Sequence, residues 1–88
     1  MVFSPNYEIV EIAEETLAVP VGEMANTSKD VFTFSNAAAT LVKRLKSHST
    51  VQELVNQLVD TYDVDDETAN EDVKRFLSSL ISYGLVIE

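Results

Sequence analysis

The sequence contains no cysteine. This absence excludes a disulfide framework, a thiolate zinc site, an iron–sulfur cluster and a catalytic thiol. No run of residues approaches the roughly 18 apolar residues that a membrane-spanning helix needs. Residues 1–5 lack the basic region and the apolar stretch that begin a secretory signal peptide. We therefore expect a cytoplasmic protein that does not enter a membrane.

Basic residues are also few. Lys and Arg number 6 against 15 Asp and Glu, and the formal net charge is −9 at pH 7. DNA-binding proteins take much of their affinity from Lys and Arg contacts to phosphates, so we expect no nucleic-acid partner. The basic cluster of Lys43, Arg44 and Lys46 fits the C-terminal end of a helix, where cations stabilise the dipole. Contact of this cluster with a partner enzyme is the alternative.

The sequence also lacks any arrangement typical of a metal, cofactor or active site. His48 is the single histidine. The acidic residues between 63 and 67 lack the central Gly and the twelfth-position Glu of an EF-hand calcium loop. Ser35, Ser49 and Thr50 have no general base beside them. We therefore expect no metal, no cofactor and no enzymatic activity.

The chain is long enough for one domain, which we place at residues 1–88. Its 88 residues are 45% apolar, which suffices for one small core. Residues 7–12, 16–21 and 31–34 have the alternation and β-branched or aromatic content of strands. We expect a tight turn at residues 14–15 and a polar loop over residues 23–30.

Helical periodicity begins after residue 35. The first helix is expected to start at residue 35 or 36 and to carry an apolar stripe of Ala38, Leu41, Val42 and Leu45. Thr50 and Glu53 form a capping box at the start of the second helix. Asp65 is the expected N-cap of the third helix, which ends before Gly84.

These elements predict an α+β fold of winged-helix type. A three-stranded antiparallel sheet is followed by a three-helix bundle, whose helices must cover one face of the sheet. Residues 85–87 form either a short last strand or a tail that caps the core. Strand 31–34 lies at an edge of this sheet, unless residues 85–87 pair with it.

An ordered series of motifs resembles the coenzyme PQQ synthesis protein D (PqqD) family. The motifs are residues 34–42 (FSNAAATLV), 49–55 (STVQELV), 58–64 (LVDTYDV), 71–77 (EDVKRFL) and 80–86 (LISYGLV). Residues 17–22 (LAVPVG) are similar to the second strand of many members that stand alone. The resemblance covers about residues 15–88. It departs from the family at Ser35, often Asn there, and at Val42, often a large aromatic.

The resemblance implies a non-enzymatic adaptor. Proteins of this family bind the leader segment of a ribosomally made precursor peptide and present it to a modification enzyme, often a radical S-adenosylmethionine enzyme. In related domains the leader docks as an extra strand beside the third strand and packs against the third helix. On this chain the docking strand would be residues 31–34 and the facing helix residues 66–83. The resemblance does not assign the chain to the PQQ pathway itself.

The residues of strand 31–34 agree with this implication. Strand addition needs an unpaired edge and pockets for alternate side chains. The strand has no proline and is flanked by Lys29 and Asp30, which limit unwanted pairing. Alternation places Phe32 and Phe34 on one face. Both Phe residues are also explained as ordinary core residues.

The third helix has more apolar surface than one stripe needs. We expect Val73, Leu77 and Ile81 to face the peptide, with Ala69, Phe76 and Leu80 toward the core. Lys74 and Arg75 either pair with acids of a leader or are ordinary solvated residues that balance Glu71 and Asp72. The predicted peptide-binding residues are Val31, Phe32, Thr33, Phe34, Val73, Lys74, Leu77 and Ile81.

Other function classes remain open. A winged-helix module for DNA binding or dimerisation would use similar elements, although DNA binding needs more bases on the third helix. A homodimer is a further alternative, because exposed strand edges also pair with themselves. A small carrier protein would need an Asp-Ser-Leu motif, which this sequence lacks.

Overall fold

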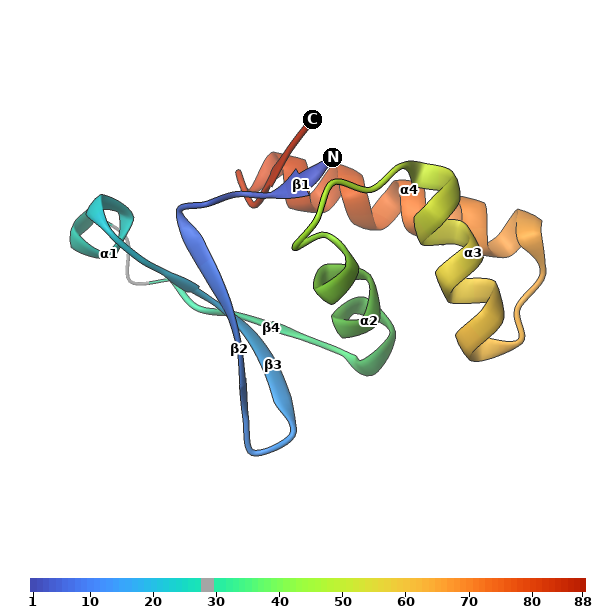
Figure 1. Ribbon diagram of the computed structural model, residues 1–88, viewed down its shortest axis with the longest axis horizontal. Coiled ribbons are helices and arrows are strands. Elements are labelled where there is room, and N and C mark those ends of the chain that lie inside the picture. Colours follow the sequence, from blue (N-terminus) through green and yellow to red (C-terminus); the bar gives the residue numbers. More distant parts are fainter. Residues whose placement is uncertain (28–29) are drawn as a thin grey trace.

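Figure 1 shows a computed structural model of the chain, which describes residues 1–27 and 30–88. Its elements are β1 (Val2–Phe3), β2 (Tyr7–Ile12), β3 (Glu15–Pro20), α1 (Glu23–Thr27), β4 (Phe32–Phe34), α2 (Asn36–Arg44), α3 (Val51–Tyr62), α4 (Asp66–Ser82) and β5 (Val86–Ile87). The predicted α+β class and the three-stranded antiparallel sheet, in the order β2-β3-β4, are confirmed. Helices α2, α3 and α4 follow β4 in the chain and match the predicted periodicities.

Strands β2 and β3 form a hairpin with a two-residue turn. Ile12 pairs with Glu15, which leaves Ala13 and Glu14 in the loop. Their φ angles are 52° and 68°, as in the type I′ turn whose twist matches that of the flanking strands. The turn therefore lies one residue earlier than the predicted residues 14–15. Neither loop residue is Gly or Asn, the types that signal such a turn.

The predicted polar loop over residues 23–30 was wrong in its first part, because Glu23–Thr27 forms α1. Gly22, with φ of +60°, ends the extended chain after β3, and Glu23 places a negative charge in the first helical turn. This short helix buries no side chain completely. It therefore lacks the apolar stripe on which sequence periodicity depends. Lys29, which we expected to guard the next strand, lies outside the described residues.

The two ends of the chain form a second small sheet. β1 pairs with β5, with Phe3 opposite Val86. The Phe3 N–H also donates to the Leu45 carbonyl at 2.8 Å, and the Ser4 N–H to the Leu85 carbonyl at 2.7 Å. The strand expected in residues 85–87 therefore exists at residues 86–87, but its partner is β1 and not β4. The edge of β4 is thus left free of this strand.

One face of the three-stranded sheet packs on the helices. Alternation in β3 buries Thr16, Ala18 and Pro20, and Phe32 and Phe34 of β4 pack against the same core. The buried core comprises Phe3, Ala18, Leu41, Val42, Leu45, Leu54, Val55, Leu58, Ala69, Val73, Leu77, Leu80, Leu85 and Val86. All three long helices contribute to it, so the sheet and helices share one hydrophobic interior.

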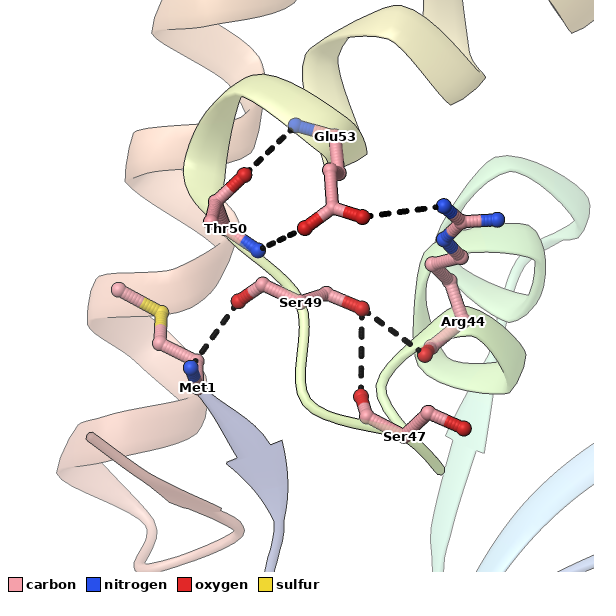
Figure 2. Close-up of polar contacts among 6 residues, drawn as sticks. All are labelled: Met1, Arg44, Ser47, Ser49, Thr50 and Glu53. Carbon is pink, nitrogen blue, oxygen red and sulfur yellow. Dashed lines mark hydrogen bonds and ion pairs between the residues drawn. The ribbon is translucent and has the colours of Figure 1, made fainter.

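The loop between α2 and α3 is tied to the N-terminus. The amino group of Met1 donates to the Ser49 carbonyl at 3.0 Å, and the Ser49 N–H donates to the Met1 carbonyl at 2.8 Å. The Ser49 hydroxyl lies 3.1 Å from the Arg44 carbonyl and 3.2 Å from that of Ser47 (Figure 2). Ser49 is buried, and these contacts satisfy its polar groups. They fix the relative placement of α2 and α3.

The predicted capping box at α3 is confirmed. The Glu53 N–H donates to Thr50 Oγ1 at 3.1 Å, and the Thr50 N–H donates to Glu53 Oε1 at 3.0 Å (Figure 2). Arg44 donates to the other carboxylate oxygen at 3.3 Å. These hydrogen bonds, chiefly the one from the Thr50 backbone N–H, hold the pKa of the Glu53 carboxyl below its ordinary value. The predicted cap Asp65 is also confirmed, and of the two predicted starts of α2 the structure has Ser35 as the N-cap.

We expect acid to destabilise the fold through such carboxylates. The pKa of Glu53, and those of Glu11 beside Lys43 and Asp65 at the Thr68 N–H, lie below their ordinary values. The unfolded chain then binds protons more readily than the folded chain as pH falls. Their contribution is complete above the ordinary carboxyl pKa of about 4 and is lost as pH falls through the lowered values. Urea unfolding at several pH values between 7 and 2.5 measures this loss.

The Glu53→Gln variant tests how much the Glu53 carboxyl contributes to the loss of stability in acid. Glutamine still accepts the Thr50 N–H in a capping box, but it does not titrate. We therefore expect a smaller loss of unfolding free energy between pH 6 and pH 3 than in the native protein. Equal losses in both proteins would show that Glu53 contributes nothing to acid sensitivity. Thr50→Ser, which keeps the capping hydroxyl and the carboxyl, is the matched control.

Candidate functional site

Strand β4 forms one outer edge of the three-stranded sheet. Its partner is β3, with Phe34 opposite Thr16 and Phe32 opposite Ala18. Within residues 1–27 and 30–88, no strand pairs with the other side of β4. An edge of this kind presents backbone N–H and C=O groups that another chain can pair with. Val31, which we included in the strand, precedes it and is 53% exposed.

Strand β2 forms the opposite edge of the sheet. It carries Glu8 and Glu11, and a cavity of about 680 Å³ lies beside its first residues and β1. Charged residues on an edge strand oppose pairing with another chain. The residues of β4, by contrast, are Phe32, Thr33 and Phe34, without a charge. The β4 edge is therefore the better surface for strand addition.

A groove runs between β4 and α4. Its cavity of about 380 Å³ is lined by Phe32, Thr33, Phe34, Ser35, Ala38, Phe76, Ser79, Leu80, Tyr83 and Leu85. The rings of Phe32 and Tyr83 lie 5.4 Å apart between centroids, and those of Phe34 and Phe76 lie 6.3 Å apart in an edge-to-face arrangement. Phe32 and Phe34 are half-buried. These two residues therefore contact the core and also line the groove.

A second cavity of about 340 Å³ adjoins the groove. Its lining residues are Ala37, Ala38, Leu41, Leu58, Tyr62, Val64, Asp72 and Phe76. Ala38 and Phe76 line both cavities. Tyr62 Oη lies 3.1 Å from Thr40 Oγ1, which positions the Tyr62 ring as a wall.

The family model for coenzyme PQQ synthesis protein D (PqqD) matches residues 8–86. The chain belongs to the PqqD family. The matched region spans the sheet of β2, β3 and β4 and all the long helices, so it contains both edges and the groove. A search of curated proteins finds no match.

Two solved structures share the fold of this PqqD-family chain. One is TbiB1 in complex with the TbiA(beta) leader peptide, at 21% identity and a TM-score of 0.81, covering 97% of this chain and 93% of TbiB1. The other is lasso peptide synthetase B1 complexed with the leader peptide, at 16% identity and a TM-score of 0.79, covering 98% and 95% of the two chains. At these identities the likeness establishes the fold.

The predicted orientation of α4 was right for Ala69 and Leu80, which belong to the core, but wrong for Val73, Leu77 and Phe76. Val73 and Leu77, which we expected to face a peptide, are 0% and 3% exposed and belong to the core. Phe76, which we expected in the core, is half-buried and lines the groove. Apolar residues occupy several stripes of this helix, and α4 packs chiefly on α3. The stripe nearest α3 became core, which periodicity alone does not reveal.

Two further predicted residues lie away from the groove. At about 100° per residue, Ile81 and Lys74 lie about 140° and 160° around the helix axis from Phe76. Ile81 is 37% exposed, and Lys74 is also exposed. The groove residues that we missed are Phe76, Ser79, Leu80 and Tyr83. Their spacing of i, i+3, i+4 and i+7 is that of one helical stripe, which is the signal that could have found them.

Charged groups border the groove without entering its apolar part. Asp72 lines the second cavity and lies 3.5 Å from Arg75 in an exposed ion pair. Arg75 is therefore partly neutralised by its neighbour, as the simpler interpretation proposed. In the basic cluster, Lys43 pairs with Glu11 and Arg44 with Glu53. These pairs join α2 to β2 and to α3, which is a structural role for two of its members.

Among the residues that the structure describes, no group of three or more His, Cys, Asp or Glu side chains could hold a metal ion. Within the same ranges, no helix is long and apolar enough to cross a membrane. The surface that the fold does offer is a strand edge beside an apolar groove.

Proposed function

We propose that this chain is a non-catalytic adaptor that binds the leader segment of a ribosomally made precursor peptide and presents it to a modification enzyme. The observation that carries the proposal is the unpaired edge of β4 beside a groove lined by Phe32, Phe34 and Phe76. Membership of the PqqD family supports it. So does the shared fold with two proteins whose structures contain leader peptides.

The geometry indicates how the peptide would bind. The leader adds to β4 as a further strand and gains main-chain hydrogen bonds along Phe32–Phe34. Alternate side chains of a strand point to opposite faces, so every second leader residue enters the groove toward α4. Apolar leader residues fit there, because the lining is aromatic and aliphatic. Thr33 contributes its backbone, since its side chain points to the other face.

The partner is an enzyme that modifies the presented peptide, and we propose a radical S-adenosylmethionine enzyme as its type. Both proteins would act in the cytoplasm, where precursors are made. A DNA-binding function is not favoured. The bases of α4, Lys74 and Arg75, stand beside Glu71 and Asp72, and Arg75 is paired with Asp72.

An amide NMR titration with leader peptides of candidate precursors from the host tests this function. We expect the largest shifts at Phe32–Phe34 and at Phe76, Ser79 and Tyr83 of α4. We expect small shifts at Lys74, on the other side of the same helix. Saturable binding at micromolar peptide would confirm a leader-binding groove and map it.

Two outcomes would contradict the proposal. One is the absence of shifts with a leader that its enzyme demonstrably requires. The other is a set of shifts confined to β2 and β1, because these would place the peptide at the opposite edge. Sedimentation at several protein concentrations completes the test. Dimers that persist with peptide present, together with unshifted β4 amides, would favour self-pairing of this edge.

A further inference from the structure

The three-stranded sheet has a second face, which points away from the helices. Alternation places Val10, Ile12, Leu17 and Val19 on it, opposite in direction to the buried Ala18. Val10 and Leu17 are direct cross-strand partners, so the apolar side chains are contiguous. We call these residues the outer apolar face.

None of the long helices α2, α3 and α4 covers the outer apolar face (Figure 1), and the short helix α1 contacts β3. Its side chains are absent from the core and from the apolar residues that pack against it. In Figure 1 the long helices α2, α3 and α4 all lie on one side of the sheet. Ile12 is 59% exposed, and Val10, Leu17 and Val19 are half-buried. An antiparallel sheet with one solvated face ordinarily shows polar residues there, so an apolar face indicates an interaction surface.

The border of this face is acidic. Glu8 and Glu15 point to the same side of the sheet, because they are the cross-strand partners of Val19 and Ile12. Glu14 lies in the adjoining turn. In the described ranges, Lys and Arg residues occur only on α2, on the loop after it and on α4. The face is therefore apolar at its centre and negative at its rim.

This charge pattern selects the class of partner. In a symmetric dimer the same patch meets itself, so the acidic rims of two copies would repel each other, in a chain of net charge −9. A protein with an apolar patch bordered by Lys and Arg would instead be attracted. The outer apolar face also lies across the sheet from Phe32 and Phe34. A peptide in the groove would leave it open.

We infer that the outer apolar face docks the modification enzyme, through an enzyme surface that is apolar at its centre and basic at its rim. The identity of this partner rests on the proposed function; the chemistry of the surface rests on the sheet itself. The adaptor then holds the leader on one side of the sheet and the enzyme on the other. Peptide and enzyme bind the adaptor without competing.

The test uses the full chain and the purified enzymes encoded beside the candidate precursors. Enzyme affinity is measured by isothermal titration calorimetry, with and without saturating leader. We expect Leu17→Lys, which places a cation at the centre of the face, to weaken enzyme binding by about 30-fold. Leader affinity should stay within about twofold, because Leu17 does not line the groove.

Further variants control for folding and for surface charge. The Glu8→Lys/Glu15→Lys double variant keeps the apolar centre and should weaken binding most at low salt, where exposed charges are least screened. Ile87→Lys alters another exposed apolar residue, on β5, and should bind the enzyme as the native chain does.

The outcomes separate this inference from the proposed function. The inference is overturned if Leu17→Lys and the double variant both bind the enzyme with the affinity of the native chain. It is also overturned if the native chain does not bind the enzyme. In either case the proposal of leader binding still stands. If the native chain binds the enzyme but does not bind the leader, the proposed function is overturned instead. Dimers of the native chain that Leu17→Lys dissociates would identify a second copy as the occupant, which also overturns the inference.

Discussion

The Phe76→Ala variant is expected to bind a leader peptide about 10- to 100-fold more weakly than the native protein. The Phe76 ring packs edge-to-face on Phe34, 6.3 Å between centroids, and lines both the groove and the second cavity beside it. Full burial of a Phe side chain contributes about 1.5–3 kcal/mol, and each 1.4 kcal/mol is a factor of ten in affinity. Isothermal titration calorimetry with one leader peptide measures the change directly.

The matched control is Lys74→Ala on the same helix. Lys74 lies about 160° around the axis from Phe76, so its removal should change leader affinity by less than about twofold at physiological salt. Circular dichroism would verify that both variants remain folded. If Lys74→Ala weakened leader binding strongly and Phe76→Ala did not, the peptide would bind on the side of α4 that was predicted from the sequence. The groove would then be the wrong site.

Local signals in the sequence predicted much of this fold. The capping box of Thr50 and Glu53, and the caps Ser35 and Asp65, act within one helical turn, so four consecutive residues suffice to identify them. The strand at Tyr7–Ile12 is similarly visible in its alternation. Gly84, with φ of +74°, follows the end of α4 as predicted. In each case the deciding interaction lies between near neighbours in the chain.

Strand pairing between residues far apart in the chain was harder to predict from the sequence. Phe3 pairs with Val86 across nearly the whole chain, and nothing within residues 1–5 signals a strand. The short helix α1 was missed for a different reason. It presents no apolar stripe, and in it only Met24 is half-buried, so periodicity has little to detect. Elements this short are held by their surroundings and not by their own sequence.

The candidate site shows the same division. The β4 residues Phe32, Thr33 and Phe34 were found because an edge strand has a clear sequence pattern and an implied role in the resembling family. The α4 residues were misassigned because a helix with apolar side chains on several stripes has more than one possible buried face. Its packing against α3 selected Val73 and Leu77 for the core and left Phe76 beside β4. Only the tertiary contacts decide between these orientations.

The Leu77→Ala variant distinguishes a core residue from a binding residue. Leu77 is 3% exposed within the core, and such truncations cost about 2–5 kcal/mol of unfolding free energy. A chain of this size has a total of roughly 4–13 kcal/mol, so the loss is a large share. We expect a fall in melting temperature of about 10–30 °C. Calorimetry and urea unfolding measure both quantities.

Leader binding by the folded protein should be nearly unchanged, because Leu77 does not line the groove. The Leu77→Met variant allows this to be measured safely, since a swap that conserves volume usually costs less than about 1.5 kcal/mol. Its leader affinity should match the native value at low temperature. If Leu77 instead contacted the peptide, both variants would lose affinity while Leu77→Ala kept most of its stability. Leader affinity is therefore expected to fall at Phe76 and to stay unchanged at Leu77, and this pair of variants locates the boundary between core and groove on α4.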